Sequence, residues 1–424
     1  MALSVNEGFT EHTFYCSFKL SPDGELRLPA RATFLGDANS FSEGYQTEEP
    51  LAISLLELDY GSIMTAYNLM ISGSDMVLNP GSTLNLQGGG YRPREGPGAG
   101  IVDADTGTGA GYGGFGGSSS GITAGYPYGN YTAALDAGSG GGQGSSGVPG
   151  RGGGLLNIKM NGGLLIDGGR EFIFTSFKFL NRFHICRWCI WQWIFGGGSG
   201  GGIYIEATGL DGHGTISSNG GDGLDQGGAG AGGRISIHLL QSYTFDGDIQ
   251  SYGGHTTIPD IATVDGAAGT VYVREEISSF PKETLRIDGQ RTSDLPTLAR
   301  TAVEPTEGNS NLLVDKLYLS GYSILEVLGT STTINFGRVF GDGTGTLIPQ
   351  EGQTLLFETD LPTTSLCVLE CSIESDDTAT VVFPPYLAID HNAHLSVRGK
   401  LDARQSTSRK EAPSNFSRPL NAFN

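Results

Sequence analysis

The chain has 424 residues, of which 69 are glycine, and it carries a formal net charge of -20 with a pI near 4.6. A nucleic-acid partner requires clustered Lys and Arg, which this sequence lacks, so we exclude nucleic-acid binding. No segment approaches the roughly 20 apolar residues that span a bilayer, and the N-terminal residues lack the basic start and apolar run of a secretory signal. The acidic balance favours solubility and affinity for divalent cations.

Glycine content divides the chain into zones. Strand-like phrases such as Met76–Leu86 and Leu387–Val397 occupy the two ends, whereas most of the glycine lies between them. No capped amphipathic run of helical length occurs, so the sequence predicts an all-β chain. We predict four regions: an N-terminal β-rung region (1–87), a glycine-rich repeat region (88–280), a C-terminal β-rung region (281–404) and a polar tail (405–424).

One phrase recurs in the repeat region, a glycine tract followed by a short strand with alternating apolar positions. Ile205 and Ile237 are 32 residues apart, and Ile237 and Val273 are 36 apart. Alternation places the apolar residues of each strand on one face, which a single unit cannot bury alone. Stacking buries it, so we predict a parallel β-helix or solenoid of stacked rungs with long glycine-rich loops. The copies are Gly150–Ile158, Gly200–Ile205, Ala231–Ile237 and Ala268–Val273, and a second strand phrase occurs at Leu164–Gly168, Gly214–Ser217 and Gly247–Gln250.

The glycine tracts allow two structures. Without Cβ atoms they either remain flexible linkers or pack backbone against backbone in extended, polyproline-II-like segments. Each tract stands immediately before a strand, which favours the packed structure.

Arg170–Phe195 differs from its surroundings because it contains all three Trp and two of the five Cys but no glycine. It lengthens the interval from Ile158 to Ile205 to 47 residues, and deleting a stretch as long as Phe172–Cys186 restores the period. Read one nucleotide later, codons permitted for its C-terminal residues can encode a phrase similar to Val264–Gly269. We therefore interpret the segment as an artefact of the gene model. The alternatives are a membrane-inserting or partner-binding hairpin, a buried strand pair, and a metal site formed by His184, Cys186 and Cys189.

Calcium is the one cofactor that the sequence suggests. Gly220–Asp225 matches the start of the calcium-binding nonapeptide of β-roll proteins, in which carboxylates and backbone carbonyls supply hard oxygen ligands. Asp222 and Asp225 are the candidate ligands. The motif occurs once, and Gly227 stands where it requires a large apolar residue.

The sequence contains no catalytic constellation with recognisable spacing. Asp246 and Asp248 flank Gly247 and lie one repeat after Asp222 and Asp225, so acidic groups of neighbouring rungs could supply an acid and a base. Aspartate beside glycine is equally typical of a turn. The five cysteines are an odd number and predict no disulfide framework.

Two N-glycosylation sequons, at Asn130 and Asn415, are compatible with secretion. The phrases Gly196–Ala207, Gly214–Gly223 and Gly228–Ile237 resemble, in their order, the repeats of uncharacterised glycine-rich cell-surface proteins of plants, protists and simple animals. The resemblance implies a secreted or membrane-anchored parent and a parallel β-helix-like repeat region. It carries over no catalytic residue.

We therefore expect a non-catalytic structural or adhesive module. Because the chain opens on a strand-like phrase, Thr13–Leu20, without a signal peptide, we expect a fragment of a larger extracellular or cell-surface protein. Its expected partners are polysaccharides or other matrix and surface proteins. The alternative is a carbohydrate-active β-helix enzyme, a lyase or hydrolase.

Overall fold

The fold is all-β, as predicted. The computed structural model describes residues 55–101, 106–118, 124–144, 147–167, 195–224, 227–256, 264–277, 281–291, 297–305, 310–357, 367–383, 387–390 and 392–403, together with the backbone of short strands at 2–4, 12–14, 18–20, 25–27, 31–34 and 172–173. Within these residues every regular element is a strand, and all but one of the strand pairs are parallel. None of them forms a helix with the length and apolar character to cross a bilayer.

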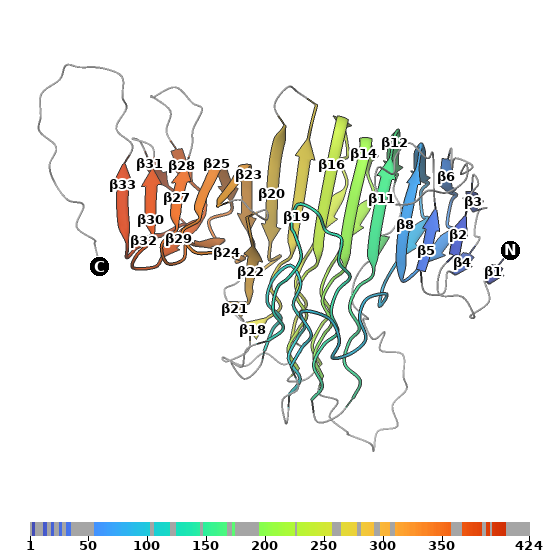
Figure 1. Cartoon of the computed structure of the whole chain (residues 1–424), viewed down its shortest axis with the longest axis horizontal. Helices are drawn as coiled ribbons and strands as arrows, with labels where there is room; N and C mark the ends of the chain where they lie inside the picture. The colour runs from blue at the N-terminus through green and yellow to red at the C-terminus, as the bar shows by residue number, and fades with distance from the viewer. Residues whose placement is uncertain are drawn as a thin grey trace, which may run out of the picture.

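Strands of the N-terminal part stack along the long axis of the molecule in three parallel rows (Figure 1). The first row contains β2 (His12–Phe14), β5 (Arg31–Phe34), β8 (Asn68–Gly73), β11 (Leu155–Met160), β14 (Gly202–Gly212), β16 (Arg234–Tyr243) and β19 (Thr270–Glu275). The second row contains β3 (Phe18–Leu20), β6 (Leu55–Leu58), β9 (Asp75–Leu78) and β12 (Gly163–Ile166), and it joins the second half of β14. The third contains β1 (Ala2–Ser4), β4 (Glu25–Arg27), β7 (Ile63–Thr65), β10 (Thr83–Asn85), β13 (Phe172–Ile173), β15 (Thr215–Ser217) and β17 (Asp248–Gln250).

The C-terminal part continues the stack after a reversal of direction. The long row runs through β20 (Lys282–Asp288), β23 (Asn311–Ser320), β25 (Thr333–Gly341), β27 (Thr354–Phe357), β30 (Thr380–Phe383) and β33 (Lys400–Ala403). A second row contains β22 (Arg300–Val303), β24 (Ile324–Val327), β26 (Thr346–Ile348), β29 (Ser372–Ser375) and β32 (Leu395–Val397). Two short parallel pairs are β18 (Val264–Asp265) with β21 (Thr297–Leu298) and β28 (Cys367–Leu369) with β31 (Leu387–Ile389).

The predicted register of the repeats is confirmed. Ile158 is paired with Ile205, Ile205 with Ile237, and Ile237 with Val273. Alternate residues of these strands point inward and form a continuous apolar core, which we call core 1 (the buried apolar side chains that the three rows of strands enclose between them, the first being Leu56 and the last Val273). Each isoleucine that this stacking buries contributes roughly 1.5–3 kcal/mol. The hydrophobic ladder is thus what sets the spacing of the strands.

One strand assignment from the sequence was wrong. Leu164–Gly168 was grouped with Gly214–Ser217 and Gly247–Gln250, but Leu164 pairs with Met76 and Leu210 in the second row. The element that aligns with β15 and β17 is β13, because Phe172 pairs with Ile216. Phe172–Ile173 therefore belongs to the stack. The rest of the anomalous segment, residues 174–194, lies outside the described residues.

The buried face of the sheet changes between β19 and β20, the antiparallel pair. Val271 and Val273 of β19 face core 1, whereas Tyr272 between them belongs to a second cluster, core 2 (the buried apolar residues from Tyr131 and Ala268 to Phe383). Tyr272 pairs with Leu285, and Val271 pairs with Arg286. Residues paired across an antiparallel ladder share a face. The sheet is therefore continuous, but its two halves bury opposite faces.

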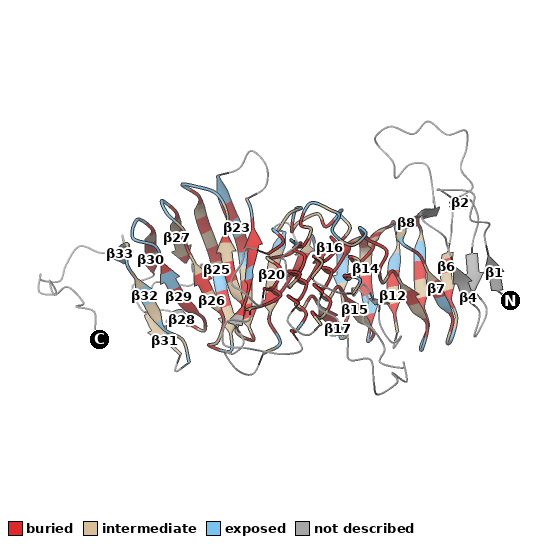
Figure 2. Ribbon diagram, turned by 90° about the horizontal axis from the view of Figure 1, so that it is seen from below, coloured by how far each residue is buried: buried red, intermediate tan, exposed pale blue. Residues whose placement is uncertain are grey.

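The glycine segments are ordered, which confirms the packed alternative. Together they form what we call the glycine bundle, the described residues of 88–154, 195–201, 218–233 and 251–269, which lies beside β14, β16 and β19 (Figure 1). Its traces are largely buried in Figure 2. Hydrogen bonds between segments repeat every third residue, and about three residues per turn is the repeat of polyproline II. The N–H groups of Gly196, Ser199, Gly197 and Gly200 donate to the carbonyls of Gly142, Ser139, Gly228 and Ala231, at 2.9, 3.0, 2.9 and 2.9 Å respectively.

Side chains join segments of the glycine bundle to one another and to the strands. The Ser218 hydroxyl donates to the Gly201 carbonyl at 2.6 Å, and the Ser251 hydroxyl, one repeat later, donates to Gly233 at 2.8 Å. Arg234 of β16 is 3% exposed. Its guanidinium donates to the Tyr128 carbonyl of the bundle at 2.9 Å and to the Ala302 carbonyl of β22 at 3.1 Å. A single buried cation thus ties three parts of the chain together.

Candidate functional site

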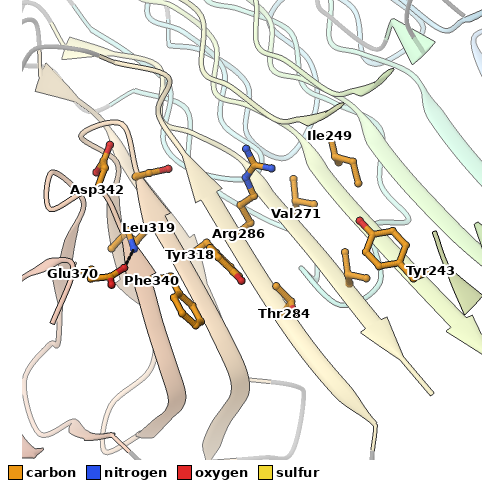
Figure 3. A pocket seen from close by; sticks show the side chains of 13 residues that line it. Tyr243, Ile249, Val271, Thr284, Arg286, Tyr318, Leu319, Phe340, Asp342 and Glu370 are labelled. Atoms are coloured by element: carbon orange, nitrogen blue, oxygen red, sulfur yellow. Dashed lines mark hydrogen bonds between the residues drawn. The ribbon is translucent and has the colours of Figure 1, made fainter. Parts of the chain in front are cut away.

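A groove of about 560 Å³ lies where core 1 ends and the sheet changes its buried face. One wall comes from β16, β17 and β19, and the other comes from β20, β23, β25 and the residue that follows β28 (Figure 3). The face of β19 that points into core 1 continues across β20, β23 and β25. In the C-terminal half this face points outward, because that half buries the opposite face. The groove lies along this outward face. Its side chains are therefore half-exposed and polar or aromatic rather than aliphatic.

The first wall is apolar. Tyr243 lies at the end of β16, and Ile249, Val271 and Val273 are the last residues of core 1 on this side. Their exposed fractions are 7% for Ile249, 6% for Val271 and 7% for Val273. The aliphatic residues are thus packed, while Tyr243 is half-buried and covers them.

The second wall carries an aromatic pair. Arg286, Tyr318 and Phe340 occupy equivalent positions on neighbouring strands, so all three project from one face. The rings of Tyr318 and Phe340 are stacked, with centroids 4.8 Å apart and planes 17° from parallel. Both rings are half-buried. Figure 3 shows them in one row with Arg286, which lies between Tyr318 and Val271. The arrangement presents flat apolar surface next to a cationic group.

Carboxylates line the end of the groove. Arg286 Nη2 lies 3.4 Å from Asp288 Oδ2. The Gly341 N–H donates to Glu370 Oε2 at 3.1 Å. Burial alone would raise the pKa of Asp342, but hydrogen bonds from the Thr344 hydroxyl and from three backbone N–H groups outweigh it and hold that pKa below its usual value of 3.8. Asp342 is therefore an anion and an acceptor near neutral pH.

These groups are suited to binding rather than proton transfer. A general acid or base works best with a pKa near the operating pH. Burial raises the pKa of Tyr243 above its ordinary value of 10.0, and the pKa of Asp342 is shifted in the opposite direction, away from neutrality. The groove combines an apolar wall, stacked rings, one guanidinium and several acceptors, which is the composition of a ligand-binding pocket.

A Ser–His contact elsewhere does not form a nucleophile. Ser236 Oγ lies 3.0 Å from His238 Nε2 on the opposite face of β16. The same nitrogen lies 2.8 Å from the Thr132 carbonyl, which can only accept, so Nε2 carries the proton. The Ser236 hydroxyl also donates to that carbonyl at 2.5 Å, and Ser236 is 0% exposed. Burial lowers the pKa of His238 below 6.5. The cluster anchors the Thr132 loop on the sheet.

The predicted calcium ligands are not brought together in the described structure. Asp222 Oδ1 accepts the N–H of His255 from the next repeat at 3.0 Å, whereas Asp225 lies outside the described residues. Among the residues that the structure places, no group of three or more His, Cys, Asp or Glu side chains is arranged to hold a metal ion. The calcium site stays a prediction from the sequence.

The carboxylates proposed for the enzyme alternative also lie apart from the groove. Asp246 is 83% exposed in its side chain and lies 3.7 Å from His213 Nδ1. The Asp248 side chain is exposed and accepts from Gln250 in the same strand. Asp246 lies at the bend before β17 and Asp248 is the first residue of that strand, and their glycine neighbour favours such a turn.

Of the two sequons, only Asn130 can be placed. Asn130 is exposed in a turn, and its Oδ1 accepts the Thr132 N–H and hydroxyl, each at 2.9 Å. Asn415 lies outside the described residues, as do Cys16, Cys186, Cys189 and His184. Cys371 is buried in core 2.

Sequence reasoning missed the groove. Its residues come from six strands and from the single residues that follow β25 and β28, and no local motif links them. The sequence signal for the groove was the pair Tyr318 and Phe340. They lie on two consecutive long strands, and each is an aromatic residue between two inward-facing positions of its own strand. Comparison with protein-family models, with curated proteins and with solved structures gave no match. We therefore infer function from the residues of this chain alone.

Proposed function

We propose that the chain is a β-solenoid module of a larger extracellular protein, and that its role is structural or adhesive rather than catalytic. The solenoid proposal is supported by the parallel registers that connect β1 to β17 and β22 to β32, with one strand per row in each repeat. Each strand contacts its neighbours in the stack, so stability accumulates by nearest-neighbour packing.

The observation that carries the functional proposal is the glycine bundle. Its segments are joined by backbone hydrogen bonds and leave no room for side chains, so a large and mostly buried part of the module is rigid backbone. Catalytic sites instead rely on side chains with tuned pKa values on positioned loops. A long stacked module with a surface groove suits attachment to polysaccharide or to other matrix and surface proteins.

The alternative, a carbohydrate-active lyase or hydrolase, requires a second group that can transfer a proton. In the groove the carboxylates of Asp342 and Glu370 accept backbone N–H groups. In Asp342 such hydrogen bonds lower the pKa and favour the ionised form. An inverting or retaining hydrolase needs one protonated carboxyl group, and Asp342 does not supply it.

Co-sedimentation with insoluble polysaccharides tests the proposal. The protein is mixed with cellulose, chitin and cross-linked pectin, the pellet is assayed for bound protein, and the supernatant is assayed for new reducing ends and for unsaturated uronate absorbance. We expect retention by at least one matrix without products. Product formation that Asp342→Asn or Glu370→Gln abolishes would establish the enzyme instead.

A further inference from the structure

We propose that the groove at the junction of the two cores binds a neutral polysaccharide chain. The inference rests on the adhesive function proposed above and names the ligand class of its site. Sugar rings have apolar faces formed by C–H groups and edges formed by hydroxyls. A site for them needs flat apolar surface and polar groups that both donate and accept.

The walls provide both. Val271, Arg286, Tyr318 and Phe340 are successive cross-strand neighbours on one face of the sheet, so a ligand that lies across the strands contacts the apolar side chain, the guanidinium and the two stacked rings in turn (Figure 3). Aromatic rings contribute large contact area with little conformational entropy to lose. The volume of about 560 Å³ falls in the range of small-molecule sites, so the groove holds a few sugar units of a longer chain.

Hydroxyl groups find partners along the polar edge. Arg286 projects from the same face as the rings and supplies N–H donors, while Thr284 and Ser320 add hydroxyls that donate and accept. Asp342 and Glu370 supply acceptors, and their own hydrogen bonds with backbone N–H groups hold them in place. Preorganised polar groups of this kind reduce the free energy lost on binding.

Charge selects against acidic chains. The single guanidinium at the edge, that of Arg286, lies beside Asp288, while Asp342 and Glu370 add two more negative charges. The whole molecule carries -20. A polyuronate or sulfated glycan would meet like charge both on approach and in the groove. A neutral chain meets no such repulsion, and its binding should depend little on salt.

Affinity electrophoresis provides the test. The full chain is run in native gels that contain hydroxyethyl cellulose, galactomannan or xyloglucan as neutral probes, and polygalacturonate as the acidic probe, at low and high salt. We expect retardation by at least one neutral probe, unchanged by salt, and none by polygalacturonate.

Phe340→Leu keeps apolar volume but loses the flat ring, and Tyr318→Ala loses the stack; each should weaken binding at least tenfold. Tyr318→Phe should bind like the parent chain.

The matched control is Leu313→Ala, because Leu313 lies on the same strand, is 60% exposed and is distant from the groove lining. It should leave retardation unchanged, and circular dichroism should show that every variant is folded.

Polygalacturonate retardation that depends on Tyr318 would overturn the neutral class and leave adhesion standing. Neutral retardation that survives both Phe340→Leu and Tyr318→Ala would place the ligand on another surface and overturn the inference. If the folded parent chain meets no retardation in any gel, the inference fails, and the proposed function then depends on protein partners.

Discussion

At Gly230, a single methyl group is enough to test how the glycine bundle is packed. A Cβ added there would overlap the carbonyl of Gly198, which belongs to the neighbouring segment. The obstacle is backbone on a hydrogen-bonded chain, so it cannot rotate away as a flexible side chain would. Gly230 does not have a positive φ, so alanine itself is not strained at this position.

We therefore expect Gly230→Ala to lower the free energy of unfolding by about 1–3 kcal/mol, the range of overpacked cores. Gly163→Ala is the matched control, because the nearest atom to its added Cβ is Asp75 Oδ1 at 3.9 Å. The control should change stability by no more than about 0.5 kcal/mol. Urea denaturation followed by circular dichroism measures both, with the midpoint compared at constant m-value. Equal stability of the two variants would contradict a close-packed bundle.

At the scale of elements, β20 is the strand at which the buried face of the sheet changes from one side to the other. Leu285 is 0% exposed and packs in core 2, while the next residue, Arg286, points into the groove. Leu285→Arg would place a charge in core 2 without a partner, and burial of an unpaired charge is strongly unfavourable. We expect this variant to unfold or to aggregate on expression. Arg286→Leu changes a half-exposed residue and should shift the unfolding midpoint little. Differential scanning fluorimetry of the pair distinguishes the faces, and the reverse order of stabilities would show that the assigned faces are wrong.

The sequence predicted the strands of the repeat well because their signal is local. Alternating isoleucines define one face, and the interval between copies defines the register, so Ile205, Ile237 and Val273 were aligned as the structure has them. Leu164 was misassigned because two rows of similar short apolar strands alternate along the chain, and composition alone does not tell them apart.

The reversal at β20 and the groove could not be predicted in the same way. An antiparallel turn between two apolar strands leaves no trace in period-2 alternation. The alternation indicates that one face of a strand is buried, but it does not indicate on which side of the sheet that face lies. The polar edge depends on Asp342 and Glu370, which the fold brings together through the Gly341 and Gly343 backbone. Such contacts follow from the stacking of whole strands. They are a property of the assembled sheet and not of any segment.

At the scale of the whole molecule, two cores lie on opposite faces of one continuous sheet, whose strands follow one another along the long axis (Figure 1). Tyr131 of the glycine bundle belongs to core 2 and packs edge-on against Tyr272, with ring centroids 5.5 Å apart. The bundle therefore covers the outer face of the N-terminal half at the point where core 2 begins. This placement explains how the sheet changes its buried face without leaving the apolar side of Tyr272 in water.

If the bundle completes the fold in this way, its amides should exchange as slowly as those of the strands. The N–H groups of Gly196, Gly197 and Gly200 are bonded to other segments, and the segment 195–201 is buried. Exchange then requires opening of the stack and not local fluctuation. We expect native-state hydrogen exchange with mass spectrometry to show equal protection for peptides covering 195–201 and for β14 and β16. The exposed turn at Gly81 should exchange much faster and serves as the internal reference. Exchange of 195–201 at the rate of that turn would mean that the glycine tracts are flexible linkers, and that core 2 is closed by other means.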